Sequence, residues 1–315
     1  MVCPRSFCMT EYAELSVTTN FSFLRGASHA EELVLTAKQL GLTAVGVADR
    51  NTLAGVVRAH IAAKEAGLRL LIGARLVPTD GPELICYPTD RAAYGRLSRL
   101  LSDGKLRAEK GDCLITLDDI LAHADGQVFI FQPPERLDTT FAETLERFAA
   151  HTPGNVYAAA TYAYHGRNRE RIARIADFCA RHGVPIIATN DVLYHTPERR
   201  PLQDVLTCIR THCTIEQAGY QLEAHAERHL KSPEEMARLF RGFEPALRRT
   251  VEIVDRCQFS LDELAYEYPD EPVPAGKTPQ EHLTDLTWSG AHWRYPEGVP
   301  GKVSAALNKE LALIE

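Results

Sequence analysis

Short apolar runs alternate with longer amphipathic stretches between residue 13 and residue 189. The short runs have the length and the β-branched and aromatic content typical of strands, and the longer stretches have helical periodicity. Seven strands are predicted, at residues 13–18, 44–48, 70–73, 84–87, 127–131, 156–159 and 185–189.

The predicted helices begin and end with recognisable signals. Residues 28–40 start with Ser28 as a candidate N-cap, have Glu31 three positions later as in a capping box, and stop at Gly41. Two further helices are predicted at residues 51–66 and 167–181. A repeated order of strand, helix, glycine and strand predicts a parallel α/β architecture. Seven such strands favour a barrel-like sheet over an open one.

The pattern changes in the last third of the chain. Residues 232–257 are predicted to be helical, with Ser232 as N-cap and Pro233 at the first helical position. Proline and acidic residues dominate residues 261–279, as in an extended linker.

Two more helices are predicted near the end, at residues 280–290 and 303–315. The second has no C-cap signal, which indicates that the natural chain continues beyond Glu315. We therefore expect three regions: a disordered start at 1–11, a main domain at 12–260, and a linker with the truncated beginning of another domain at 261–315.

Composition and charge narrow the possible roles of the chain. The formal net charge is -7, which argues against a domain whose main function is to bind nucleic acid. No uninterrupted apolar run approaches the roughly 20 residues of a membrane span, and the first residues lack the apolar core of a secretion signal. Eight cysteines occur without C-x-x-C spacing, so we expect reduced thiols and a cytoplasmic location without membrane contact.

Polar motifs follow several predicted strands in a fixed order. They read SVTTNFSFLRGAS (16–28), VGVADRN (45–51), LIGAR (71–75), IATNDVLY (187–194), DVLTCIR (204–210) and LKSPEEMARLF (230–240). This succession resembles the PHP domain at the front of bacterial DNA polymerase III alpha subunits, which are C-family polymerases. The first string resembles the error-prone branch of that family. The resemblance runs from residue 12 to residue 255, and residues 266–315 are similar to the segment that joins this domain to the polymerase core.

The resemblance implies a fold and a site. The fold is α/β, a distorted TIM-like (β/α)7 barrel, followed by a short, mostly helical lead-in to a polymerase core. Members with a working site bind two or three metal ions, and several hydrolyse phosphodiesters. Their ligands come from His-x-His, Asp-His and Asn-Asp-x-His motifs and from a Glu after Ile-Gly. The matching positions here are Ser16, Thr18, Arg25, Asp49, Arg50, Arg75, Asn190, Asp191 and Leu193.

These residues are a poor set of metal ligands. Alternate residues of a strand point to the same side, so two imidazoles at i and i+2 can reach one ion, but Ser16 and Thr18 carry neutral hydroxyls. Arginines occupy three further ligand positions, and Asp49 and Asp191 are the surviving carboxylates. We predict Arg–Asp ion pairs where the metals would lie. No metal and no catalytic residue are expected in this chain.

Two other groups of residues have alternative interpretations. His195, His212, His225 and His229 are close in sequence and could bind a metal, although half-buried histidines near loops are the commoner case. Arginines 167, 171, 174 and 181 lie on one side of a predicted helix. They form either a solvated basic face or a surface directed at DNA.

Three functions remain open at this point. The resemblance implies part of an error-prone DNA polymerase acting in damage-induced repair and translesion synthesis, with Mg²⁺ bound by a polymerase core outside this chain. Its partners would be template-primer DNA, the sliding clamp and accessory mutagenesis proteins. The first alternative is a PHP-type metal-dependent phosphoesterase. The second is a stand-alone, non-catalytic interaction module.

Overall fold

The computed structural model describes residues 11–264 and 272–315 of the 315-residue chain. Most of the start expected at 1–11, and part of the linker expected at 261–279, lie outside the described residues. The chain divides into two compact units, Met1–Leu264 and Ala265–Glu315.

The first unit is built on one seven-stranded sheet, whose strands follow the order of the sequence. The strands are β1 (Ala13–Val17), β2 (Ala44–Arg50), β3 (Arg69–Leu76), β4 (Leu84–Pro88), β5 (Gln127–Phe131), β6 (Val156–Thr161) and β7 (Ile186–Thr189). All seven predicted strands are therefore confirmed, with small shifts at their ends.

The predicted parallel arrangement does not extend to β4. This strand is antiparallel to both β3 and β5, whereas the other neighbouring pairs are parallel. Residues 77–83 alone connect β3 to β4. A parallel crossover needs about a dozen residues or more, so this short connection can only form a hairpin.

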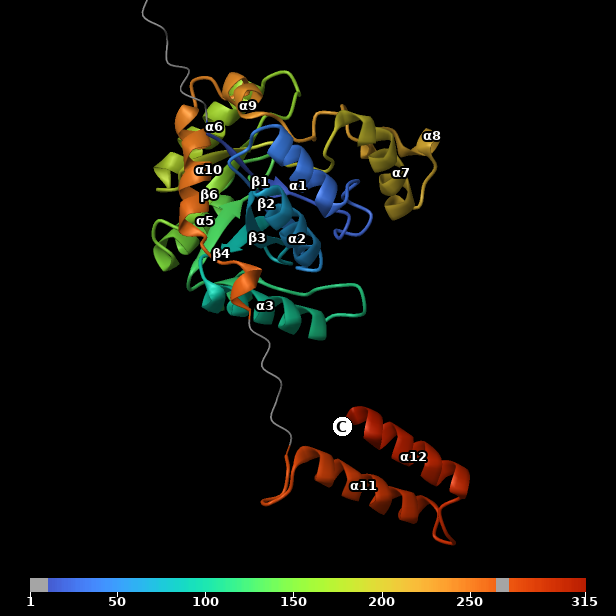
Figure 1. The fold of residues 1–315 in the computed structure, drawn as a ribbon. Helices are drawn as coiled ribbons and strands as arrows, with labels where there is room; N and C mark the ends of the chain where they lie inside the picture. Colours follow the sequence, from blue (N-terminus) through green and yellow to red (C-terminus); the bar gives the residue numbers. More distant parts are fainter. Residues whose placement is uncertain (1–10, 265–271) are drawn as a thin grey trace, which may run out of the picture. The chain divides into compact units, whose positions relative to one another are not determined.

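The sheet curls until its first and last strands meet (Figure 1). Val17 pairs with Val192 just beyond β7, and the backbone N–H of Thr18 donates to the carbonyl of Val192 at 2.9 Å. In return, the N–H of Val192 donates to the carbonyl of Ser16 at 2.8 Å. The result is a distorted, nearly closed α/β barrel, as the sequence predicts.

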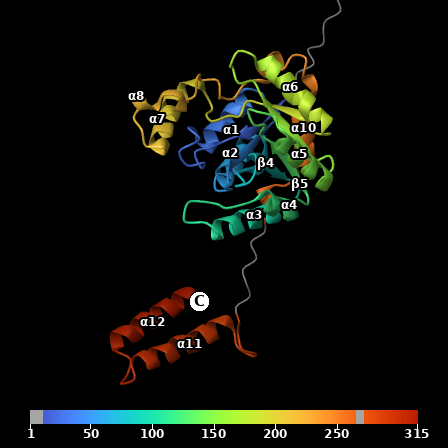
Figure 2. The same ribbon diagram turned by 180° about the vertical axis from the view of Figure 1, so that it is seen from behind.

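Helices cover the outside of this barrel, and α7 and α8 stand away from it (Figures 1 and 2). The helices of the first unit are α1 (Ala30–Gln39), α2 (Val56–Ala66), α3 (Arg91–Leu106), α4 (Leu117–Ala122), α5 (Thr139–His151), α6 (Asn168–Arg181), α7 (Arg200–Thr211), α8 (Ile215–Ala218), α9 (Pro233–Leu239) and α10 (Glu244–Arg256). Short 3-10 turns lie at Pro197–Arg199, Gly219–Gln221 and Leu261–Glu263.

Two predicted helix starts are wrong. Helix α2 begins at Val56 instead of residue 51, because Asn51 has a φ of +48° and its amide N–H donates to the carbonyl of Arg75 at 2.8 Å. Helix α1 is capped at His29 instead of Ser28. The Ser28 hydroxyl lies 2.7 Å from the ring Nδ1 of His195 and accepts a bond from its backbone N–H.

The helix predicted at 232–257 is in fact two helices. The N-cap at Ser232 is confirmed, because its hydroxyl accepts the amide N–H of Glu235 at 3.3 Å. Helix α9 then ends, and Gly242, with a φ of +90°, turns the chain into α10. A left-handed residue of this kind is most easily supplied by glycine.

The barrel interior is filled by side chains, and α10 packs at one end. Tyr87 is fully buried and lies against Gly46 and Gly73, where any larger residue would collide with its ring. Its hydroxyl donates to the carbonyl of Leu15 at 2.9 Å. Ile253 of α10 belongs to the same interior cluster. Helix α10 covers the N-terminal ends of the strands. The opposite end of the barrel, where the parallel strands have their C-terminal ends, is therefore left for polar side chains.

The second unit contains α11 (Pro279–Arg294) and α12 (Gly301–Ile314). Both predicted helices are confirmed, with longer bounds than expected for the first. Gln280, at the start of α11, donates to the carbonyl of Leu311 near the end of α12 at 2.9 Å, so the pair is antiparallel. Across the described residues, no helix is both long and apolar enough to cross a membrane.

Candidate functional site

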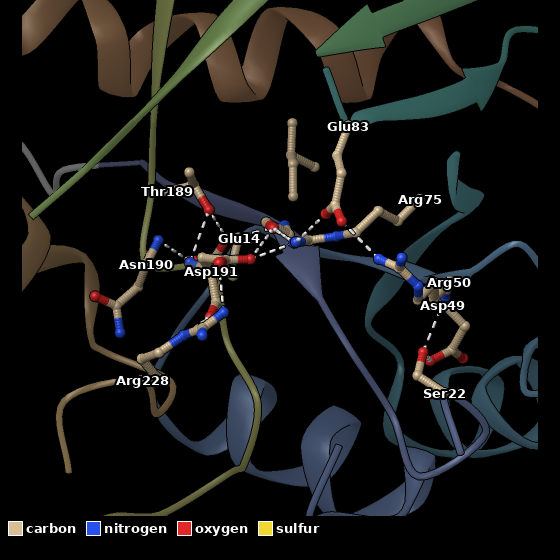
Figure 3. A network of polar contacts seen from close by, with 12 residues as sticks. Glu14, Ser22, Asp49, Arg50, Arg75, Glu83, Thr189, Asn190, Asp191 and Arg228 are labelled. Carbon is tan, nitrogen blue, oxygen red and sulfur yellow. Dashed lines mark hydrogen bonds and ion pairs between the residues drawn. The ribbon is translucent and has the colours of Figure 1, made fainter. Parts of the chain in front are cut away.

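The predicted site residues come from strands whose C-terminal ends meet at one mouth of the barrel. Ser16 is in β1, Asp49 and Arg50 end β2, and Arg75 is near the end of β3. Asp191 follows β7. Because these strands are parallel and the barrel nearly closes between β1 and β7, residues distant in sequence become neighbours here (Figure 3).

Asp191 is the centre of the polar network. Its Oδ1 pairs with the guanidinium of Arg75, and its Oδ2 pairs with the guanidinium of Arg228. The hydroxyl of Ser16 donates to the same Oδ1 at 2.9 Å, and Arg75 also donates to the Ser16 oxygen at 2.8 Å. The predicted Arg–Asp ion pair is confirmed for Arg75 and Asp191, and Arg228 adds a second one.

These contacts set the charge state of both partners. Burial alone raises the pKa of Asp191, but Arg228 and Arg75, with the hydrogen bonds from Arg75 and Ser16, outweigh it and hold that pKa well below its usual value. Burial alone lowers the pKa of Arg75, but Asp191 and Glu83 raise it overall. Each partner thus favours the charged form of the other.

Glu83 links the network to the neighbouring strand ends. Its Oε1 lies 2.5 Å from Nη1 of Arg50, and its Oε2 lies 3.5 Å from Nη1 of Arg75. The residue lies in the turn between β3 and β4. Arg50 is thus paired with Glu83, a residue that the sequence motifs did not single out.

The predicted pairing of Asp49 with an arginine is wrong. Asp49 is buried and accepts the backbone N–H and the hydroxyl of Thr19, both at 2.8 Å, and the hydroxyl of Ser22 at 2.6 Å. Burial raises the pKa of Asp49 above its usual value, although these hydrogen bonds act in the opposite direction. Asp49 therefore holds the loop after β1 in place.

The other predicted residues lie around this network without joining it directly. Thr18 is buried and bonds through its backbone to Val192. The amide group of Asn190 donates to the carbonyls of Glu227 and His229 at 2.7 and 2.6 Å. Leu193 is buried in a small separate cluster. Arg25 lies near Arg50 and Arg210, since their charges act on it.

Glu14 is a buried carboxylate beneath the site that the sequence motifs missed. It is 1% exposed and accepts four hydrogen bonds. Two come from the hydroxyls of Tyr12 at 2.7 Å and Thr189 at 2.6 Å, and two from the backbone N–H groups of Ser16 at 2.9 Å and Asn190 at 2.8 Å. Burial raises its pKa, against the effect of these bonds. The sequence signal for Glu14 was a charged residue inside the short predicted strand AELSV.

Arg228 and Glu223 were also missed, because they come from an irregular loop. Arg228 donates from Nε to the carbonyl of Asp191 at 2.9 Å and from Nη1 to Glu223 at 2.6 Å. In the same loop, His225 lies 2.8 Å from the carbonyl of Ala163. No periodic pattern marks this segment, so the sequence carried no signal for it.

The residues at this mouth do not fit the two or three metal ions that the family resemblance implies. Both carboxylate oxygens of Asp191 face guanidinium groups, and those of Asp49 face hydroxyl and amide donors. Guanidinium groups cannot be deprotonated in proteins and cannot act as ligands. Within residues 11–264 and 272–315, no group of three His, Cys, Asp or Glu is placed to hold a metal ion.

Comparison with known proteins places this geometry in a family. The PHP domain profile matches residues 14–186, more than half of the chain. An error-prone DNA polymerase of Caulobacter vibrioides is 60% identical over 305 residues, which cover 96% of this chain and 28% of that protein. An error-prone DNA polymerase of Brucella abortus is 52% identical over 314 residues, covering 97% and 29% respectively.

The chain therefore spans less than a third of the length of these relatives. Among solved structures, an amidohydrolase from Chromobacterium violaceum is similar with a TM-score of 0.47 and 14% identity, over 58% of this chain and 87% of that one. The match to the family profile and the seven-stranded barrel agree: the chain belongs to the PHP domain family.

Proposed function

We propose that this chain is the PHP part of an error-prone DNA polymerase, and that its barrel has a structural role in place of metal-dependent hydrolysis. The observation that carries the structural role is the convergence of Arg75 and Arg228 on Asp191. Two cations occupy both oxygens of a carboxylate that a metal site would need.

The ion pairs join the strand ends that metal ions would join in a metal site. In a metal site, several strand ends are joined through a shared cation. Here Arg75 from β3, Ser16 from β1 and Asp191 after β7 are joined directly, and Arg228 ties in the loop before α9. The strand ends at this mouth are thus joined by side chains of the chain itself, and no hydrolysis takes place there.

The polymerase role rests on the relatives and on the motif resemblance. The nucleotide-transfer chemistry would lie outside this chain, in a core whose carboxylates bind Mg²⁺. The partners would be template-primer DNA, the sliding clamp and accessory mutagenesis proteins, in damage-induced repair and translesion synthesis in the cytoplasm. The barrel would brace that core.

A hydrolysis assay tests the structural role. The chain, incubated with Mn²⁺, Zn²⁺ or Fe²⁺ and bis-p-nitrophenyl phosphate, is expected to release no nitrophenol above the metal-only control. Hydrolysis that the chain accelerates and that Asp49→Ala or Asp191→Ala abolishes would show a working metal site. The structural role would then be wrong, while the polymerase assignment would stand.

The polymerase assignment has a separate test. An antibody against this chain, used on an extract of the source cells, is expected to detect a band several times heavier than 35.0 kDa. A single band near 35 kDa would contradict the assignment and favour a free-standing interaction module.

A further inference from the structure

A groove lies beside the polar network, on the outer side of Arg50. It has a volume of about 860 Å³ and is open to solvent. Three loops line it: the one after β1, which carries Phe23 and Arg25, the one after β2 and the one after β3. A fourth wall comes from Lys105 of α3 and residues 109–114.

The reversed strand β4 explains why α3 reaches this end of the barrel. Because β4 is antiparallel, α3 starts at the far end and runs back toward the mouth. The segment after α3 then joins the segment after β3, since the N–H of Thr79 donates to the carbonyl of Ile115 at 2.9 Å. The groove is thus built by the element that departs from the regular barrel pattern.

The groove is lined by more positive than negative side chains. Arg25, Arg50, Lys105 and Lys110 line it, and only Arg50 forms an ion pair with a carboxylate of the described residues. Glu109 and Asp112 offset this charge in part. Burial, followed by the charges of Arg50 and Arg210, lowers the pKa of Arg25. An anion placed among these cations would relieve their mutual repulsion.

An exposed aromatic ring lies on the same groove. Phe23 is 81% exposed, and Phe21 lines the groove beside it. Cations that follow a backbone, combined with an aromatic face for stacking, are the arrangement by which proteins hold unpaired nucleotides. A duplex would bring its phosphates to the cations but would keep its base faces from the ring.

We propose that this groove binds a single-stranded segment of nucleic acid, with its phosphates on Arg25, Arg50, Lys105 and Lys110 and a base stacked on Phe23. The site does not depend on the polymerase assignment, because it rests on residues of this chain alone. The net charge of -7 repels polyanions at long range, so we expect weak binding, with a Kd of about 1–100 µM.

The test is the binding of a fluorescein-labelled dT12 oligonucleotide to the 315-residue chain, followed by anisotropy at 50 mM salt. Phe23→Ala is expected to weaken binding about fivefold or more through lost stacking, and Phe23→Tyr to restore it. The double variant Lys105→Ala/Lys110→Ala is expected to weaken binding about tenfold. All three side chains are exposed, so these variants leave the core intact.

The matched control removes two cations from another arginine-rich surface, on α6. The double variant Arg174→Ala/Arg181→Ala is expected to change dT12 binding less than twofold. With two to four phosphates held, the logarithm of the binding constant should fall with a slope of about -1.5 to -3 against the logarithm of the salt concentration.

Three results would overturn the proposal. The first is an absence of dT12 binding up to 1 mM, well above the range of about 1–100 µM that is typical of non-specific sites. The second is an equal loss in the α6 control, which would mean diffuse attraction. The third is equal affinity for a twelve-base-pair duplex together with no effect of Phe23→Ala. That result would show that no base stacks on Phe23.

Discussion

Asp191 shows how one carboxylate can join several parts of the barrel mouth. Its backbone is left-handed, with a φ of +47°, which turns the side chain back toward β1 and β3. Its carboxylate is 19% exposed, so the charges around it are only partly screened. A single carboxylate just beyond β7 therefore pairs with two guanidinium groups at once.

Replacing Asp191 with Asn tests the strength of this arrangement. At neutral pH, Asp191→Asn is expected to lower the free energy of unfolding by about 3 kcal/mol, the low end for breaking a buried pair. The two partly buried guanidinium groups lose the carboxylate that they share, while Glu83 and Glu223 remain near them. Urea denaturation measures the loss. Asp125→Asn, which removes an exposed carboxylate paired with Arg96, is the control and should cost less than about 1 kcal/mol.

The same variant has a distinctive pH dependence. The pKa of Asp191 is lowered in the folded protein, so below about pH 4 the unfolded chain binds the proton more readily. The contribution of the carboxylate is thus complete above about pH 4 and is lost as the pH falls toward the folded value. The stability gap between wild type and Asp191→Asn should narrow below pH 4. A gap that stays constant from pH 7 to pH 3 would contradict the ion pairs.

Part of the residue-level picture could be predicted, and part could not. The ion pair between Arg75 and Asp191 followed from charges at strand ends that a barrel brings together. The hydroxyl cage of Asp49 did not, because Thr19 and Ser22 belong to a loop whose path the sequence leaves open. Arg228 could not be found either, since it reaches the site from an irregular segment.

At the scale of elements, apolar patterning located strands well but did not give their direction. The run in β4 is apolar like those of its neighbours, and only the short connection at 77–83 indicates a hairpin. Helix starts were less predictable, because capping depends on tertiary partners. Ser28 has the right chemistry for an N-cap, yet His195 holds its hydroxyl instead.

Gly55, at the start of α2, allows a test of how tightly this end of the barrel is packed. A Cβ there would lie 2.8 Å from Oδ2 of Asp49 and 3.0 Å from Oγ1 of Thr19. Gly55 has an ordinary φ of -81°, so Gly55→Ala tests crowding without backbone strain. We expect a loss of about 1–3 kcal/mol in the free energy of unfolding, measured by urea denaturation.

The control for this substitution is Gly95→Ala in α3. Gly95 is exposed, and a Cβ there would meet no atom within 4 Å. Replacing a helical glycine of this kind should raise stability by about 0.5–1 kcal/mol. Equal effects of the two variants would contradict the close approach of α2 to Asp49.

For the molecule as a whole, the proposed structural role means that folding needs no bound metal. The strand ends are joined by side chains, so removal of divalent ions should leave the balance between folded and unfolded chain unchanged. We expect no shift in Tm when EDTA is added, measured by calorimetry. We also expect less than about 0.1 equivalent of Mn, Zn or Fe after dialysis, by elemental analysis. A fall of several degrees with EDTA, or one retained equivalent, would show that a metal supports the barrel.

The hydrogen bond from the backbone N–H of Asn190 to the carboxylate of Glu14 joins residues that are 176 positions apart in the chain. A ribosome adding about 5–20 residues per second needs about 9–35 s to make that stretch. Throughout this time the edge of the first strand has no partner on one side, and the Glu14 carboxylate lacks two of its four donors, Thr189 and the backbone N–H of Asn190. The nascent barrel is therefore exposed to mispairing until its last strand leaves the ribosome, and closure is the step that a chaperone would most need to protect.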